Sequence, residues 1–330
     1  MGLHAVRTAL RSATQEPIHK FNQWRYQRRM KIAATDPISD TCKTELQKIC
    51  EFSDLSEVPK EELPAKLSDF EAIIVRSKTK VTKELIDSAP NLKAVIRGGV
   101  GIDNIDSEYC KSKNIQVHNT PNAPSRAVAE LSVTHMLSML RNVPRADATT
   151  KAGEWLKKEL KGRELTGKTV GIIGFGRIGY EVGRILNAFN CEILIVDPYA
   201  ESNLISEVNG LKVELDELLE KSDILTIHVP LLDSTKGMLG AEQFKQMKNG
   251  VLIVNDARGP IVEEQALCDA LSSGKVAMAA LDVYWEKTPE GSCILEHKDK
   301  LVLTPHIGSA TYEAQDRIGS EIVELVKNLS

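Results

Sequence analysis

The sequence predicts an α/β fold made of two domains, each built on a parallel sheet. The chain has 330 residues, about twice the length of a typical domain. Short runs rich in Val, Ile and Leu alternate with stretches of helical periodicity, which is typical of parallel sheets buried on both faces. These runs fall into two series, separated by a proline-containing loop and an apolar helical stretch. We therefore expect two sheets rather than one.

The two series give the expected strands in order. The first series is expected at 31–35, 72–76, 93–98 and 115–119. The second is expected at 168–174, 192–197, 223–229, 250–257, 276–283 and 301–306. Segment 125–143 has apolar residues at helical spacing and follows the loop NTPNAP, so it predicts a helix at the domain junction. A last helix at 311–327 could pack on either domain.

Composition and charge exclude several classes of protein. The net charge is −4, with 42% hydrophobic and 27% charged residues, so nothing overall attracts nucleic acid or an anionic membrane. No apolar run reaches the roughly 18 residues that a membrane span requires. Six cysteines are scattered without paired spacing, which predicts reduced thiols in a cytoplasmic setting and neither a disulfide framework nor a metal site.

The amino-terminal segment has a composition of its own. Residues 1–29 hold six Lys and Arg residues and one acid, Glu16. A basic, acid-poor leader is typical of an organellar transit peptide, which would place the protein in a mitochondrion or another organelle. The alternatives are a disordered extension and translation from an upstream start.

The stretch TVGIIGFGRIG contains G-x-G-x-x-G between an expected strand and an expected helix. Gly174 allows a tight turn, Gly176 lets the backbone approach a pyrophosphate, and Gly179 lets helix and strand pack closely. The helix N-terminus and Arg177 would add N–H groups and charge. Asp197 ends the next strand, where a carboxylate binds ribose hydroxyls and repels a 2′-phosphate. The sequence predicts NAD rather than NADP; alternatively, the aspartate only caps the turn before the following proline.

Three further strand ends carry polar side chains: Arg258, Asp282 and His306. Because the carboxyl ends of parallel strands meet at one edge of a sheet, we expect these residues to lie together there. A guanidinium stays charged and binds a carboxylate through two N–H groups. An imidazole gives or takes a proton near neutral pH. Hydride transfer between nicotinamide and a 2-oxo acid needs both groups, which indicates a dehydrogenase.

A set of motifs, in a fixed order, carries a family resemblance. They are VRSKTKVT (75–82), RGGVGIDNID (97–106), NTPNAPSRAVAEL (119–131), GKTVGIIGFGRIG (167–179), HVPLLDSTKGML (228–239), NDARGPIVEE (255–264) and TPHIGSATYEAQ (304–315). From Met30 to the end, the chain resembles the D-2-hydroxyacid dehydrogenase family, and it is most similar to the D-3-phosphoglycerate dehydrogenases within it. The resemblance implies two Rossmann-like or flavodoxin-like domains: a discontinuous substrate domain (30–124 and 308–330) and an inserted NAD-binding domain (125–307).

The resemblance also implies the residues that hold each ligand. For the cofactor they are Val100, Gly174, Gly176, Arg177, Ile178, Gly179, Asp197, Val229, Pro230, Asp256, Ala257, Arg258, Asp282, His306 and Gly308. For the substrate they are Arg76, Ser77, Gly99, Val100, Arg258 and His306. Three more cations could serve a phosphate or be merely solvated: Lys78, Lys80 and Arg141.

A homodimer is a further implication of the resemblance. Helix 125–143 and the segment GEWLKKELKGREL that follows it would contribute the interface. Trp155 and Leu156 would be its apolar anchors. The alternative is that both side chains pack in the core of their own domain.

One position departs from the family pattern. The family pairs its histidine with a glutamate five residues after the aspartate of the LDV strand, and here that position is Lys287. A glutamate orients the imidazole and stabilises its charged form, whereas a lysine disfavours that form. Four readings stay open. Glu286 turns inward to pair with His306; Lys287 takes part in proton transfer or binds an anionic substrate; the chain has lost turnover; or Lys287 points to solvent.

The leading interpretation is an NAD-dependent D-3-phosphoglycerate dehydrogenase of the short form, without C-terminal regulatory domains. It would oxidise 3-phosphoglycerate to 3-phosphohydroxypyruvate in serine biosynthesis. Within the enzyme class, the alternative is a glyoxylate/hydroxypyruvate reductase or a related D-2-hydroxyacid dehydrogenase. The alternative from another class is an NAD(H)-sensing interaction protein that kept the fold and lost turnover.

Overall fold

The computed structural model describes residues 29–329, so the expected leader lies outside the described residues except for its last one. By its contacts the chain divides into two units. The first comprises the chain up to Ile96, Asn104–His118 and the chain from Val323; the second comprises Arg97–Asp103 and Asn119–Ile322. Residues 97–103, 119–124 and 308–322, expected in the first domain, fall in the second unit. The first two of these segments are linked, because the Thr120 N–H donates to the Gly99 carbonyl at 3.1 Å.

The first unit contains a five-stranded sheet within the described chain, in the order β2-β1-β3-β4-β5. The strands are β1 (Lys31–Ala34), β2 (Glu51–Asp54), β3 (Ala72–Val75), β4 (Ala94–Arg97) and β5 (Gln116–Asn119). The helices are α2 (Asp40–Ile49), α3 (Leu63–Lys66), α4 (Lys83–Asp87) and α5 (Ser107–Ser112). Strand β2 was not expected from the sequence, because EFSD is a half-exposed edge strand without an apolar run.

The second unit contains a seven-stranded sheet within the described chain, in the order β12-β11-β10-β9-β6-β7-β8, with every neighbouring pair parallel. The strands are β6 (Thr169–Ile173), β7 (Glu192–Val196), β8 (Gly210–Lys212), β9 (Ile224–Ile227), β10 (Val251–Asn255), β11 (Val276–Leu281) and β12 (Leu301–Leu303). The predicted fold class is confirmed. Edge strand β8, only three residues long, was missed.

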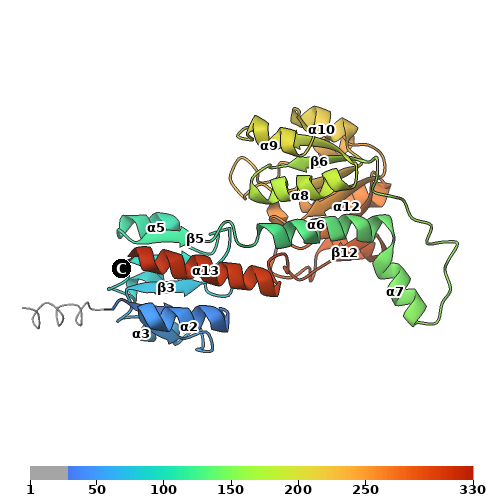
Figure 1. Ribbon diagram of the computed structural model, residues 1–330. Helices are drawn as coiled ribbons and strands as arrows, with labels where there is room; N and C mark the ends of the chain where they lie inside the picture. Colours follow the sequence, from blue (N-terminus) through green and yellow to red (C-terminus); the bar gives the residue numbers. More distant parts are fainter. Residues whose placement is uncertain (1–28, 330) are drawn as a thin grey trace, which may run out of the picture. The chain divides into compact units, whose positions relative to one another are not determined.

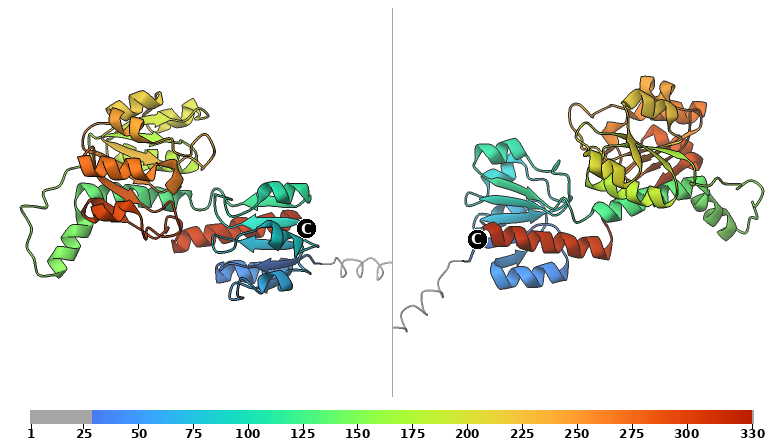
Figure 2. Two further views of the ribbon diagram at one scale, coloured as in Figure 1. Left: turned by 180° about the vertical axis from the view of Figure 1, so that it is seen from behind. Right: turned by 45° about the horizontal axis from the view of Figure 1, so that its top comes forward.

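Helices cover both faces of this sheet (Figures 1 and 2). The helices of the second unit are α6 (Ser125–Leu140), α7 (Val143–Lys151), α8 (Arg177–Ala188), α9 (Ser202–Glu207), α10 (Leu215–Lys221), α11 (Ala241–Gln246), η2 (Gly259–Ile261), α12 (Glu264–Ser273) and η3 (Cys293–Lys300). The last helix, α13 (Tyr312–Leu329), is divided between the two units, because the chain from Val323 belongs to the first. Helices α6 and α8 pack into one core cluster and α10, α11 and α12 into the other. No helix of the described chain is long and apolar enough to cross a membrane.

The strand order reverses between β6 and β9, which are neighbours in the sheet. From β6 the chain adds β7 and β8 on one side, and β9 begins the other half. In a doubly wound sheet the loops diverge at such a reversal and leave a crevice at the carboxyl ends of the strands. The fold therefore places the loops after β6 and β9 where a dinucleotide binds.

The cysteines differ from expectation in one pair. Cys268 in α12 and Cys293 in η3 form a disulfide with an S–S distance of 2.04 Å, so the prediction of reduced thiols was wrong for these two. They lie 25 residues apart and meet because η3 packs against α12, which spacing alone does not reveal. Cys42 and Cys50 are free, buried thiols, and burial raises the pKa of Cys42 to about 12 and that of Cys50 to about 11.

Candidate active site

The glycine loop between β6 and α8 has the geometry of a pyrophosphate cradle. Gly174 has φ +92°, and a Cβ there would lie 2.8 Å from the His228 carbonyl carbon after β9. A Cβ at Gly179 would lie 2.1 Å from the Gly174 carbonyl oxygen, so helix and turn pack with no room for a side chain. A Cβ at Gly176 would meet nothing within 4 Å. The loop is thus tight beneath and open at its middle glycine, where the phosphates would lie.

Asp197, after β7, ties this loop to the next turn. One carboxylate oxygen accepts the Phe175 N–H at 2.7 Å, and the other accepts the Tyr199 N–H at 2.8 Å. The turn-capping role weighed from the sequence is therefore present. A carboxylate has about four acceptor positions, so two remain to meet ribose hydroxyls. Arg177, exposed in the first turn of α8, donates from Nε to the Asn122 side-chain oxygen at 2.5 Å.

Arg258 follows β10 and is held by a carboxylate. Its Nε and Nη2 both donate to Oδ2 of Asp103, at 3.0 and 2.6 Å, and its Nη1 donates to the Ala257 carbonyl at 2.6 Å. A Cβ at Gly101 would lie 1.7 Å from Nη2 of Arg258. Gly101 therefore leaves the space that the guanidinium fills. Asp103 was not identified as a site residue from the sequence.

Arg97, at the end of β4, is a second cation that the sequence reasoning missed. Its Nη1 donates to the Gly98 carbonyl at 3.3 Å, and a Cβ at Gly99 would lie 1.4 Å from that nitrogen. The motif RGGVG could have indicated this position of Arg97, because glycines directly after an arginine leave room for its side chain to fold back. From this motif the sequence predicted only Gly99 and Val100 as ligand-binding residues, and Val100 is exposed.

His306 follows β12 and lies among these charged groups. Burial lowers the pKa of its imidazole, and the Arg258 and Arg97 guanidiniums lower it further, while Asp282 and Asp103 partly offset the shift. Part of the residue is still exposed, so a substrate could reach it. With its pKa below the usual value, the ring is neutral at pH 7 and suited to accept a proton.

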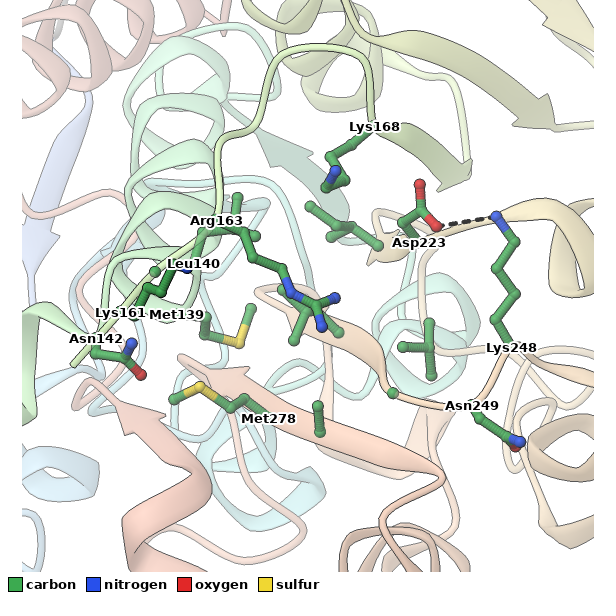
Figure 3. Close-up of a pocket in the computed structure, with 16 residues that line it drawn as sticks. Met139, Leu140, Asn142, Lys161, Arg163, Lys168, Asp223, Lys248, Asn249 and Met278 are labelled. Carbon is green, nitrogen blue, oxygen red and sulfur yellow. Dashed lines mark hydrogen bonds and ion pairs between the residues drawn. The ribbon is translucent and has the colours of Figure 1, made fainter. Parts of the chain in front are cut away.

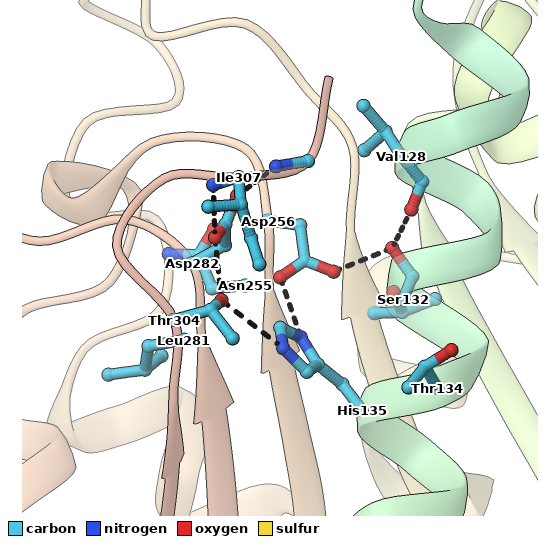
Figure 4. Close-up of polar contacts among 12 residues, drawn as sticks. Val128, Ser132, Thr134, His135, Asn255, Asp256, Leu281, Asp282, Thr304 and Ile307 are labelled. Carbon is cyan, nitrogen blue, oxygen red and sulfur yellow. Dashed lines mark hydrogen bonds and ion pairs between the residues drawn. The ribbon is translucent and has the colours of Figure 1, made fainter. Parts of the chain in front are cut away.

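Asp282, after β11, shapes the loop that carries His306 (Figure 4). Its Oδ1 accepts the Thr304 hydroxyl at 2.6 Å and the Ile307 N–H at 2.8 Å. Its Oδ2 accepts the Gly308 N–H at 2.8 Å. Three donors thus occupy most of the acceptor positions of the Asp282 carboxylate, and Asp282 thereby anchors this loop.

Asp256 was expected to contact the cofactor, but its carboxylate bonds to helix α6 instead. The side chain is fully buried and bonds to Ser132 at 2.7 Å and His135 at 3.0 Å, both on α6 (Figure 4). A cofactor contact at this position would therefore involve the backbone. The other expected cofactor residues follow the carboxyl ends of their strands: Ile178, Val229, Pro230, Ala257 and Gly308.

Two expected substrate residues, Arg76 and Ser77, belong to the first unit, directly after β3. The Arg76 N–H donates to Asp36 at 2.6 Å, and burial lowers the pKa of its guanidinium. The Lys78 ammonium donates to the Ser56 carbonyl at 2.7 Å, which is a structural contact. Lys80 is exposed.

Lys287 and Glu286 are both exposed. Within residues 29–329, neither side chain forms a hydrogen bond or ion pair, with His306 or with any other residue. The segment before them is anchored: Trp285 Nε1 donates to the Val262 carbonyl at 2.7 Å, and the Tyr284 hydroxyl donates to the Thr304 carbonyl at 2.9 Å. This anchoring ends at Trp285, two residues before Lys287.

A pocket of about 330 Å³ lies at the opposite edge of the second sheet, by the amino ends of β6, β9 and β10 (Figure 3). Its apolar lining includes Met139 and Met278, and Lys248 pairs with Asp223 at its rim at 2.9 Å. Arg141, proposed for a phosphate, ends α6 beside Leu140 of this pocket. It therefore lies at the carboxyl end of α6, beyond Ser132 and His135, which contact Asp256 after β10.

Comparison with known proteins gives a consistent result. Residues 133–308 match the family described as D-isomer specific 2-hydroxyacid dehydrogenase, NAD binding domain. A D-3-phosphoglycerate dehydrogenase of Methanocaldococcus jannaschii is 42% identical over 91% of this chain and 57% of its own length. A hydroxypyruvate reductase of Thermotoga maritima is 42% identical over 90% of this chain and 97% of its own.

The solved structures agree. A D-lactate dehydrogenase from Aquifex aeolicus, crystallised with NAD and lactic acid, superposes with a TM-score of 0.79 and 32% identity, covering 91% of this chain and 95% of that one. The chain spans little more than half the length of the phosphoglycerate dehydrogenase relatives.

Proposed function

The chain belongs to the D-2-hydroxyacid dehydrogenase family and binds NAD, and from that premise we propose that it oxidises D-3-phosphoglycerate to 3-phosphohydroxypyruvate. The observation that carries the proposal is that the guanidiniums of Arg258, after β10, and Arg97, at the end of β4, both act on the ring of His306, after β12. Two guanidiniums suit a substrate with two anionic groups, and a neutral imidazole suits removal of a hydroxyl proton.

Each residue has a distinct part in the proposed reaction. Arg258 binds the substrate carboxylate, as a guanidinium does through two N–H groups. His306 takes the proton from the 2-hydroxyl as the C–H bond breaks, and NAD, when bound, supplies the hydride acceptor. The loop glycines Gly174, Gly176 and Gly179 hold the pyrophosphate. Arg97 meets the phosphate of the substrate.

The test is a panel of substrates. We expect NAD reduction with D-3-phosphoglycerate, and NADH oxidation with 3-phosphohydroxypyruvate at a higher kcat/KM than with hydroxypyruvate or glyoxylate. Equal or better use of the unphosphorylated acids would contradict the proposal. No turnover of any acid, with NADH still bound, would indicate a sensing protein instead.

Arg97→Ala separates binding of the phosphate from the rest of catalysis. We expect KM for 3-phosphohydroxypyruvate to rise about tenfold or more, since a charged hydrogen bond contributes roughly 1.5–3 kcal/mol. KM for hydroxypyruvate, which lacks the phosphate, should change little. Arg184→Ala is the matched control, because Arg184 is a surface arginine paired with Glu181 on α8. A loss shared equally by both substrates would assign Arg97 to the carboxylate instead.

A second candidate is hydroxypyruvate reductase. The observation in its favour is the Thermotoga maritima relative, of which this chain covers 97% at 42% identity. The substrate panel decides between the two, because a reductase of this kind needs no group for a phosphate.

A further inference from the structure

One face of helix α6 is directed at the carboxyl ends of β10, β11 and β12 (Figure 4). Val128, Ser132 and His135 are spaced i, i+4 and i+7, which puts them on a single stripe of a helix. Val128 lies against Gly308, where an added Cβ would come within 3.3 Å of it. The other two make polar contacts and are fully buried. A buried polar stripe is unusual beside apolar strands and calls for a role.

The polar contacts form a continuous chain from α6 to the His306 loop. Ser132 donates to Oδ2 of Asp256 at 2.7 Å, and Oδ1 of Asp256 lies 3.0 Å from Nδ1 of His135. Nε2 of His135 lies 3.3 Å from the Thr304 hydroxyl. Thr304 in turn donates to Asp282 at 2.6 Å. The chain links α6, β10, β12 and β11.

Counting protons fixes the direction of the central contact. The Thr304 hydroxyl has one hydrogen, and the short bond to the acceptor-only carboxylate of Asp282 uses it. Thr304 must therefore accept from His135, so Nε2 of His135 carries a proton. Oδ1 of Asp256 lies 3.0 Å from the other ring nitrogen, Nδ1. The ring is thus held at both ends by hydrogen-bonding partners.

The loop that receives this support has a strained backbone. His306 has φ +57°, the left-handed region that a residue with a side chain rarely adopts. Such a conformation persists only where surrounding contacts over-determine it. Here the contacts are the bonds from Ile307 and Gly308 to Asp282 and from the His306 N–H to the Thr304 carbonyl at 3.0 Å. Asp282 and Thr304 are the two groups that hold the loop, and both belong to the chain from α6.

We propose that His135 is a positioning residue for the reaction: by donating from Nε2 to Thr304 and pairing with Asp256, it fixes Asp282 and thereby the strained loop of His306. The proposal rests on the proposed function, because it concerns the group that takes the substrate proton. It assigns the buried Asp256 a structural partner instead of a cofactor. His135 is 1% exposed, so in this proposal it acts through Thr304 and Asp256 rather than on a ligand directly.

The first test needs no turnover. With the protein labelled at its histidines with ¹⁵N, the ring-nitrogen shifts at pH 7 report which nitrogens carry protons, and the His135→Asn variant identifies the signal. We expect Nε2 of His135 to be protonated. A bare Nε2 would leave no donor toward Thr304 and would overturn the proposal, whatever the activity of the protein.

The second test breaks the link without leaving a charge unpaired. Thr304→Val keeps the shape of the side chain and removes the hydroxyl, and Thr304→Ser restores it. We expect Thr304→Val to lower kcat for hydroxy-acid oxidation about tenfold, with the NADH dissociation constant changed less than about threefold, and Thr304→Ser to recover the rate. Unchanged kcat in a folded Thr304→Val protein would overturn the proposal.

The pH profile distinguishes positioning from loss of stability. The charged groups that face His306 are Arg97, Arg258, Asp103 and Asp282, and all of them remain in Thr304→Val. Asp282 raises the pKa of His306, so a looser Asp282 should let that pKa fall. The acid limb of oxidation should then move to lower pH. A fall in melting temperature with an unmoved limb and normal kcat would indicate a merely structural contact.

A double variant and a matched control complete the design. His135→Leu and Thr304→Val act through the same link, so the losses of kcat should not multiply in the double variant; fully multiplicative losses would contradict a shared path.

Ser132→Ala should lower kcat, whereas Ser222→Ala should not. Both serines are fully buried, and each hydroxyl lies within 3.0 Å of the carbonyl oxygen four residues earlier, at Val128 and Leu218, but only the Ser132 hydroxyl also reaches a carboxylate, that of Asp256.

The two proposals fail in different ways. If the wild type turns over no 2-hydroxy or 2-oxo acid, the proposed function fails, while the protonation of His135 still decides whether the link to Thr304 exists. If the wild type is active and Thr304→Val matches it, only the positioning role fails.

Discussion

The lowered pKa of His306 follows from burial and from two neighbouring guanidiniums, Arg258 and Arg97. A histidine with a lowered pKa is neutral at pH 7, so it is ready to take a proton but must first be charged to give one. In the proposed reaction, His306 would therefore favour oxidation of a hydroxy acid near neutral pH. Reduction needs the charged ring.

This predicts opposite pH dependences for the two directions. Oxidation needs the neutral ring, so its kcat/KM should be constant above the lowered pKa and fall only below pH 6.5. Reduction needs the charged ring, so its rate should fall as pH rises through that same value. Initial rates from pH 5 to 9 in both directions check this. His306→Asn should lose about 10²-fold or more in both directions. An acid limb of oxidation above pH 6.5 would contradict the assignment.

Lys287 stands where the resemblance implies a glutamate, and its side chain is exposed and forms no hydrogen bond or ion pair with the described residues. We therefore expect Lys287→Ala to keep kcat/KM within about twofold, as surface substitutions usually do. Steady-state kinetics and a pH profile measure this, with Lys287→Glu alongside. A large loss in Lys287→Ala with a moved profile would instead place the lysine in the proton transfer. A loss in Glu286→Gln would implicate Glu286.

At the scale of elements, the β6–α8 turn shows why two of its glycines differ in their tolerance of a side chain. Gly179 lies against the Gly174 carbonyl, where a Cβ would come within 2.1 Å. Gly176 is open, with nothing within 4 Å of a Cβ. At Gly179 the packing of helix against turn leaves no room for a side chain. At Gly176 the space remains available to the cofactor.

Two alanine variants should therefore separate stability from binding. Gly179→Ala should lower both the melting temperature and NADH affinity, since a clash of this size must displace helix α8. Gly176→Ala should keep the melting temperature within a few degrees but weaken NADH binding about tenfold, because its Cβ takes space that the pyrophosphate would use. Thermal denaturation and fluorescence titration measure the two effects. Unchanged NADH affinity in Gly176→Ala would remove that glycine from the cradle.

Helix α6 was predicted from the sequence, but its contacts were not. Its periodicity predicted the helix, and the structure has it from Ser125 to Leu140. The same pattern did not reveal that Ser132 and His135 bond to Asp256, because those contacts depend on which strand the helix packs against. Edge strands β2 and β8 were missed for a related reason: both depend on pairing with a neighbour rather than on apolar residues of their own.

At the scale of the whole molecule, an exposed arm follows α7. The segment between α7 and β6 runs away from the sheet of the second unit before it returns, where the Arg163 N–H donates to the Leu140 carbonyl at 2.9 Å (Figure 1). Trp155 on this arm is 81% exposed, and Val143 at the start of α7 is 51% exposed. Leu156 is only half-buried, so neither expected anchor is a core residue of the described chain. Such apolar exposure is typical of a surface that binds a partner.

We therefore expect a homodimer that depends on the arm. Size-exclusion chromatography with light scattering should give twice the 36.4 kDa chain mass for the wild type. Trp155→Glu should shift the protein toward monomer, because a charge in an apolar interface is left without a partner. Tyr199→Glu is the control, since Tyr199 is 91% exposed and lies outside the arm. A wild-type monomer, or a dimer unaffected by Trp155→Glu, would contradict this role.

The sequence by itself determined the fold class, the glycine loop, the choice of NAD and the strand ends that carry Arg258 and His306. Those features follow from local patterns, and strand ends of a parallel sheet meet at one edge by rule. Only the tertiary structure decided the partners. Arg258 pairs with Asp103 across 155 positions, and His135 pairs with Asp256 across 121. No spacing in the sequence encodes such distant contacts, because they form when a helix or loop packs against a strand end.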